Sequence, residues 1–129
     1  MEATLEAQTD DKRRAWSYNG AIEAGLDPKS YSWADVPTGT WLARLDFKIW
    51  SNKTSAGCLG CYFTSLADGR QYQLSAFRPY RSTSRCYSPT DDGIDFSRPG
   101  LDGQIFQLEV GKAANGKIKW LSAKFEKDL

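Results

Sequence analysis

The chain has 129 residues, 40% of them hydrophobic and 26% charged, and its formal net charge is +1 at pH 7. This length fits one domain that buries a core without metal or disulfide support, and the composition is that of an ordinary globular protein. No stretch approaches the roughly 18 apolar residues of a membrane span, and the first residues lack the basic start and apolar core of a signal peptide. We therefore expect a cytoplasmic protein with no membrane partner, whose charged surfaces come from local segregation of charge.

Residues 1–39 form an N-terminal lead-in of different character from the rest of the chain. Asp10 and Asp11 are both candidate caps for a short helix, and Gly25 is its expected stop. Its apolar positions are sparse, so an irregular segment is the alternative. We expect this lead-in to pack on a domain formed by residues 40–129.

Residues 40–50 alternate between apolar and mostly polar side chains, and the apolar set is Trp41, Ala43, Leu45, Phe47 and Ile49. Because successive side chains of a strand point to opposite faces, this pattern predicts a half-buried strand with that set facing the core. At about 3.3 Å per residue the strand would span about 33 Å, which is longer than most strands. A strand this long in a small domain usually bends and pairs with two neighbours.

Four further runs have the pattern of strands, and they cover about residues 58–66, 70–77, 105–110 and 118–125. An Asp-Gly pair joins the first two of these runs and an Asn-Gly pair joins the last two, so both pairs are predicted hairpins. Combining the alternation of all the strands gives an expected core of Trp41, Leu45, Phe47, Phe63, Tyr72, Leu74, Phe106, Leu108 and Trp120.

The order of these strands, a three-stranded meander followed by an excursion and a final hairpin, resembles the OB-fold. The resemblance covers about residues 40–125 and implies a mainly β fold, a small five-stranded antiparallel barrel of the single-strand-binding type. One feature departs from the family pattern. The proline and glycine content of residues 78–104 excludes the helix that usually lies between the third and fourth strands. A loop this long is either functional or a sign of misassigned elements, so a general small barrel or sandwich is the alternative.

Three cysteines, Cys58, Cys61 and Cys86, raise the question of a metal site, since the first two have the spacing of a zinc knuckle. A structural zinc site needs four Cys or His ligands, and the chain has no histidine. Cys61 also falls in the alternating apolar run of its strand, as a small buried side chain would. A redox Cys-x-x-Cys pair normally opens a helix, whereas this one runs into a strand. We therefore expect no metal and no cofactor.

The sequence feature that points to a function is a run of arginines interleaved with aromatic residues, in and after the third strand, with no acidic residue between Gly69 and Thr90. The arginine guanidinium donates two parallel hydrogen bonds to a phosphate and also stacks on flat rings, and aromatic side chains stack on bases. A surface that binds single-stranded nucleic acid requires this combination. Together with the aromatic residues expected on the outer face of the barrel, the candidate nucleic-acid-binding residues are Trp50, Tyr62, Arg70, Phe77, Arg78, Tyr80, Arg81, Arg85 and Tyr87.

The acidic residues that follow are Asp91, Asp92, Asp95 and Asp102. Such a cluster could bind a hard cation or supply a catalytic pair, but no histidine, nucleophile elbow or glycine-rich phosphate loop accompanies it. Asp and Gly in a loop are most often turn formers. We therefore expect no catalytic residue and a protein that is not an enzyme.

The same residues are also compatible with a second function. An aromatic and arginine surface beside an acidic stretch also has the composition of a protein interface. The alternative is therefore a protein-interaction module or inhibitor, such as a phage or mobile-element accessory protein that occludes a host protein. Acids folded back over the arginines would favour this alternative, and acids pointing away would leave a basic groove for single-stranded nucleic acid.

Overall fold

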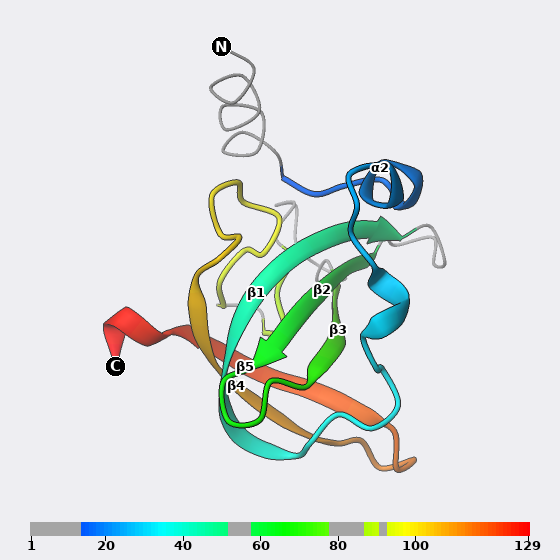
Figure 1. The fold of residues 1–129 in the computed structure, drawn as a ribbon. Coiled ribbons are helices and arrows are strands. Elements are labelled where there is room, and N and C mark those ends of the chain that lie inside the picture. Colours follow the sequence, from blue (N-terminus) through cyan, green and yellow to red (C-terminus); the bar gives the residue numbers. More distant parts are fainter. Residues whose placement is uncertain (1–13, 52–57, 78–86, 91–92) are drawn as a thin grey trace.

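The computed structural model describes residues 14–51, 58–77, 87–90 and 93–129 of the chain (Figure 1). Its elements are α2 (Tyr18–Glu23), η1 (Pro28–Ser30), β1 (Gly39–Ser51), β2 (Cys58–Ser65), β3 (Gln71–Phe77), β4 (Ile105–Lys112), β5 (Ile118–Phe125) and η2 (Glu126–Asp128). The mainly β character predicted from the sequence is confirmed. Within these residues no helix has the length and apolar character needed to cross a membrane.

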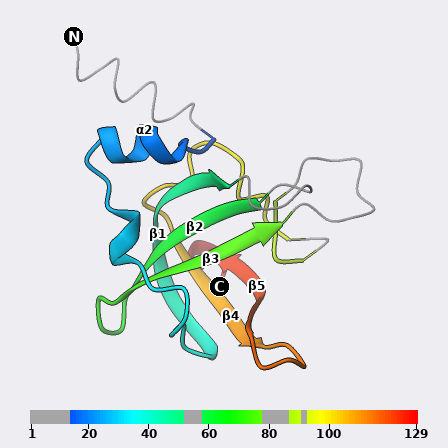
Figure 2. The same cartoon turned by 90° about the vertical axis from the view of Figure 1, so that its right-hand side faces the viewer.

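The strands form one five-stranded antiparallel sheet in the order β3-β2-β1-β4-β5. The long first strand bends, pairing with β4 along residues 39–44 and with β2 along residues 43–51 (Figure 1). The edge strands β3 and β5 do not pair with each other, so the sheet curves without closing into the predicted barrel (Figure 2). This topology is consistent with an OB-like β fold.

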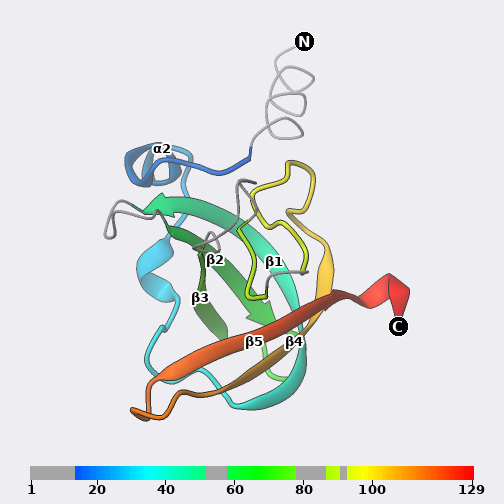
Figure 3. The same ribbon diagram turned by 180° about the vertical axis from the view of Figure 1, so that it is seen from behind.

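Both predicted hairpin turns are present, and each depends on a glycine with positive φ. Gly69, between β2 and β3, has a φ of 73°, and Gly116, between β4 and β5, has a φ of 82°. Glycine adopts this region without the steric cost that a Cβ atom imposes. Seen from behind, the β4–β5 hairpin lies on the side of the sheet away from α2 and η1 (Figure 3).

A β-bulge at Asp46 interrupts the long first strand. Leu45 pairs with Phe63 of β2, but Phe47 pairs with Tyr62, so Asp46 is an extra residue on β1. An extra residue shifts the alternation of a strand by one position and moves every later side chain to the other face.

The bulge overturns the prediction that a single apolar face runs along β1. Leu45 faces the main core as expected, whereas Phe47 and Ile49 belong to a second cluster on the outer face of the sheet. Lys48 and Trp50 take the core side instead, and Lys48 is only 1% exposed. The second half of the strand therefore has the opposite orientation to the one its sequence pattern suggests.

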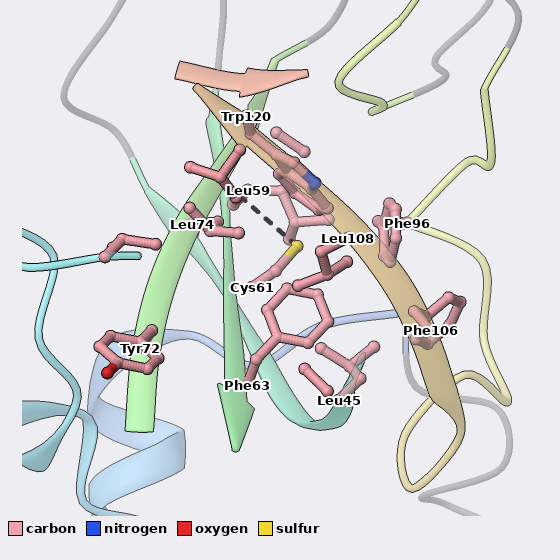
Figure 4. Packing of buried hydrophobic residues seen from close by; sticks show 14 of the residues in the cluster. Leu45, Leu59, Cys61, Phe63, Tyr72, Leu74, Phe96, Phe106, Leu108 and Trp120 are labelled. Carbon is pink, nitrogen blue, oxygen red and sulfur yellow. Dashed lines mark hydrogen bonds between the residues drawn. The ribbon is translucent and has the colours of Figure 1, made fainter. Parts of the chain in front are cut away.

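The main core lies on the concave side of the sheet (Figure 4). The predicted core residues other than Phe47 lie in this cluster, or pack against it in the case of Trp41. Phe63 is at its centre and makes edge-to-face contacts with Phe96, Phe106 and Trp120, with ring centroids 5.6–6.3 Å apart. Aromatic pairs favour this geometry because the positive edge of one ring meets the negative face of the other.

The excursion between β3 and β4 contains no helix among its described residues, as expected, but it contributes directly to the core. Phe96 and Leu101 are almost completely buried in the main cluster. The Lys48 ammonium donates hydrogen bonds to the carbonyl oxygens of Phe96 and Arg98, at 2.6 and 2.7 Å. The excursion is thus tied to β1 by both apolar packing and a buried polar contact.

The helix of the lead-in is shorter than predicted and starts later. Ser17 caps it by accepting a hydrogen bond from the Gly20 N–H at 3.0 Å, and residues 14–16 before it are not helical. The predicted caps, Asp10 and Asp11, lie outside the described residues. Gly25 follows the helix with a φ of 88°, which agrees with the predicted stop.

Candidate functional site

The outer face of β1 and β2 is covered by the lead-in through a small aromatic cluster. The Tyr31 ring meets the edges of Phe47 and Tyr62 at centroid distances of 5.3 and 5.2 Å, and Phe47 and Tyr62 stack on each other at 4.6 Å. Ala21 of α2 and Ile49 of β1 complete the buried set. Burial of these residues fixes the lead-in on the sheet because it removes apolar surface from water.

Main-chain hydrogen bonds hold the lead-in at two separate strands. The Trp16 N–H donates to the Lys48 carbonyl and the Trp50 N–H donates to the Trp16 carbonyl, both at 2.9 Å. Further along, the Gln73 N–H donates to the Ser32 carbonyl at 2.9 Å, so β3 is bridged as well. The lead-in therefore crosses the sheet as an anchored strap.

Asp46, the bulged residue, is the polar anchor of this strap. Its carboxylate accepts hydrogen bonds from the Tyr31 hydroxyl at 2.7 Å, from the Arg44 Nε at 2.7 Å and from the Thr64 hydroxyl. Burial, together with the hydrogen bond to Asp46 and its negative charge, raises the pKa of Tyr31. The bulge thus places a carboxylate where the lead-in needs an acceptor.

An open groove of about 860 Å³ lies between the lead-in and β1–β3. Five of the residues that line it are aromatic, and these are Tyr18, Tyr31, Trp33, Trp50 and Tyr62. Tyr31 and Tyr62 are buried and the Trp50 side chain packs on the core side of the sheet, so Tyr18 and Trp33 supply the exposed rings. Among the described residues that line it, Lys29 is the one charged side chain and no carboxylate is present. Trp33 is 73% exposed and Tyr18 is 45% exposed, so flat rings at its rim are open to a ligand.

Gly60 and Gln73 form part of the floor of the groove. A Cβ atom at Gly60 would lie 3.1 Å from the Gln73 Nε2 and 3.2 Å from the Tyr62 ring. Both distances are tighter than ordinary contacts, so the missing side chain at Gly60 leaves the space in which the Gln73 amide lies.

One end of the groove meets the excursion at Trp50. The Trp50 ring contacts Tyr87 edge-to-face with centroids 5.3 Å apart, and the Arg14 guanidinium carbon lies 5.6 Å from the Trp50 ring centroid. Arg14 also donates to the carbonyl and hydroxyl oxygens of Ser97, at 3.0 and 2.8 Å. Lead-in, sheet and excursion therefore converge on this one tryptophan.

Asp95 fixes the excursion at the same place. Its Oδ1 accepts hydrogen bonds from the Tyr87 N–H, the Ser97 N–H and the Ser97 hydroxyl, at 3.0, 3.0 and 2.7 Å. Burial raises the pKa of the Asp95 carboxyl, but these hydrogen bonds outweigh it and hold the pKa below its usual range. Asp95 thus serves as a loop anchor, as the turn-forming interpretation of the acidic stretch suggested.

The predicted site residues have different positions in the structure. Tyr62 faces outward as expected but is buried beneath the lead-in, and Trp50 is half-buried on the core side because of the bulge. Phe77, 49% exposed, ends β3 and is bridged to Ser88. The remaining candidates Arg78, Tyr80, Arg81 and Arg85, and the acidic residues Asp91 and Asp92, lie outside the described residues.

Arg70 does not join the other candidates. It precedes β3 at the β2–β3 turn, whereas Phe77, Trp50 and Tyr87 gather at the other end of that strand. Its guanidinium Nε lies 3.8 Å from an Asp68 carboxylate oxygen, and its side chain is 77% exposed. Arg70 and Phe77 stand at opposite ends of β3, so the length of the strand separates them.

Sequence reasoning did not select Tyr18, Lys29, Trp33 or Gln73 as site residues. The available signal was the aromatic content of a lead-in that lacks the apolar periodicity of a long helix. Tryptophan is enriched among the residues that contribute most to binding at interfaces, so an exposed tryptophan in such a segment is a candidate binding residue.

The side chains of Cys58 and Cys61 lie on opposite faces of β2. β2 pairs with β3 in continuous register, so residues three apart point to opposite faces of the sheet. Cys61 lies in the main core, where burial raises the pKa of its thiol, and Cys58 does not belong to that cluster. The two sulfur atoms therefore cannot ligate one ion, and the described residues contain no other cluster of metal-ligating side chains. Cys86 lies outside the described residues.

Comparison of the chain with protein-family models, with curated proteins and with solved structures finds no significant match.

Proposed function

We propose that this protein binds single-stranded nucleic acid in the groove between the lead-in and β1–β3. The observation that carries the proposal is the lining: the exposed rings of Tyr18 and Trp33 and the charge of Lys29, with no carboxylate among the described lining residues. Unpaired bases expose flat faces that stack on aromatic rings, and each stacked base contributes about 1–3 kcal/mol of binding free energy. A negatively charged chain also meets no repulsion from this lining.

The arginine-rich segment supports the proposal through the position of its two ends. Phe77 precedes the segment and Ser88 follows it, and the Ser88 N–H donates to the Phe77 carbonyl at 3.4 Å. Tyr87 contacts Trp50, which borders the groove. Both flanks of the segment that carries Arg78, Arg81 and Arg85 therefore lie near Trp50, and in this proposal these arginines contact the phosphates of the bound strand.

The hydrogen bonds of Asp95 also favour nucleic acid over a protein interface in which acidic residues cover the arginines. Its Oδ1 is engaged by the main chain and hydroxyl of Ser97 and by the Tyr87 N–H. A carboxylate oxygen that already accepts three hydrogen bonds is a weaker counter-ion for an arginine than a free one.

The test is a fluorescence-anisotropy titration of labelled single-stranded and double-stranded oligonucleotides at two salt concentrations. We expect single strands to bind more tightly, with a logarithmic salt dependence that reflects about three or four neutralised phosphates. Replacing Arg81 and Arg85 with Ala should flatten that dependence, whereas Lys124→Ala, far from the groove on β5, should leave it unchanged. No binding at micromolar protein in low salt would overturn the proposal and favour a protein partner.

A further inference from the structure

Gln73 has an unusually well-defined position on the floor of the groove. It lies in the middle of β3, opposite Tyr62, and its neighbours Tyr72 and Leu74 are buried in the main core. Its own N–H donates to the Ser32 carbonyl of the lead-in at 2.9 Å. Pairing on both sides of the strand, together with the buried neighbours, fixes the direction in which this side chain leaves the sheet.

The absence of a side chain at Gly60 leaves space for the amide group of Gln73 in the groove. The Nε2 atom lies 3.1 Å from the point that a Cβ atom at Gly60 would occupy. A larger residue at position 60 would displace either this amide or the Tyr62 ring, which would be 3.2 Å away. Gly60 therefore leaves room for a polar amide beside the Tyr62 ring.

Unlike the amides of Gln71 and Gln104, the Gln73 amide has no hydrogen-bond partner within the described part of the chain. Gln71 donates to the Tyr31 hydroxyl at 3.2 Å and accepts from the Ser30 hydroxyl at 3.1 Å. Gln104 donates to the Gly100 carbonyl at 2.8 Å. A ligand that covers the Gln73 amide must supply hydrogen bonds in place of those that water can make with it.

From this geometry we infer that Gln73 reads the edge of one nucleobase that stacks in the groove, so that binding discriminates among bases at one position. The inference rests on the proposed function. A carboxamide offers a donor and an acceptor side by side, and base edges differ in the order of these groups. A base with the wrong edge leaves the amide unpaired in a partly dehydrated site, which weakens its binding.

The test compares the affinities of oligo-dT, oligo-dC, oligo-dA and an abasic strand of equal length, at one salt concentration. We expect the best and worst of the three homopolymers to differ by roughly 5- to 100-fold, the range of one good base-edge contact. Gln73→Leu should reduce this spread to about twofold and leave the salt dependence unchanged, because the side chain is neutral. Gly60→Ala, which crowds the amide without removing it, should also reduce the spread.

Gln107→Leu is the matched control, since Gln107 lies on β4 outside the groove and its replacement should preserve the wild-type spread. Homopolymers that bind wild-type protein within about twofold of each other would overturn the inference while leaving the proposed function intact. So would a spread that persists in Gln73→Leu, because stacking strength alone would then explain it. If no oligonucleotide binds at all, both proposals fail.

Discussion

The Nζ atom of Lys48 lies 2.6 Å from the carbonyl oxygen of Phe96, and the lysine side chain is 1% exposed. A lysine from the middle of the longest strand therefore ends in the core, where it holds the excursion through main-chain carbonyls. No carboxylate of the described residues lies within ion-pair distance of it. Burial lowers the pKa of its ammonium, and the negative charges of Asp102 and Asp95 oppose this shift only in part. Such a contact makes the excursion part of the folded core.

Replacing Lys48 with Met should destabilise the protein, although methionine is apolar and similar in length. The carbonyl oxygens of Phe96 and Arg98 would lose their donor, and a buried unsatisfied acceptor costs about 1–3 kcal/mol. Urea unfolding followed by tryptophan fluorescence measures the loss. Lys124→Met at an exposed position of β5 is the control. Equal stability of Lys48→Met and wild type would show that the two hydrogen bonds of Lys48 do not stabilise the fold.

Phe47→Ala should lower the free energy of unfolding by about 3–5 kcal/mol, as expected for a buried phenylalanine. This loss would come from the outer cluster, because Phe47 stacks on Tyr62 and supports Tyr31 of the lead-in. The same variant should therefore make the lead-in more sensitive to limited proteolysis after Lys29. A loss below about 1 kcal/mol would mean that the lead-in is not seated on Phe47.

The free energy of unfolding should fall at alkaline pH, in part through Tyr62. Burial raises the pKa of Tyr62 to about 12, so the unfolded chain releases the hydroxyl proton at a lower pH than the folded protein does. Stability contributed by this group is complete below the ordinary pKa of 10.0 and is lost as the pH rises toward 12. Urea unfolding at a series of pH values between 10.0 and 12 measures this effect, and the free energy of unfolding of Tyr62→Phe should fall less with pH than that of wild type. A pH dependence identical to that of wild type would refute the contribution of Tyr62.

Trp33→Ala should weaken binding of single-stranded DNA without affecting stability. The side chain is 73% exposed, so its loss removes little packing, while one base-stacking contact contributes about 1–3 kcal/mol of binding free energy. Anisotropy titration and thermal unfolding measure the two effects separately. Leu66→Ala, at an exposed position between β2 and β3, is the control for loss of exposed apolar surface. Unchanged affinity in Trp33→Ala would remove this ring from the proposed site.

The amino-acid sequence by itself determined the strands and their hairpins. Alternation along residues 70–77 and the glycines at 69 and 116 are local features, because side-chain direction and turn conformation depend on neighbours in the chain. The same holds for the antiparallel pairing within the two hairpins and for the inward face of most strands. These properties need no knowledge of which segment lies across the sheet.

Only the tertiary structure decided which way the second half of β1 faces and where the groove lies. The bulge at Asp46 is a property of pairing with β2, and it places Lys48 in the core and Phe47 outside, against the alternation of the sequence. The groove exists because the lead-in returns across β1–β3 and brings Trp33 over Gln73, forty residues further along the chain. Contacts between segments so far apart depend on the folded arrangement of the whole chain, which short-range patterns do not contain.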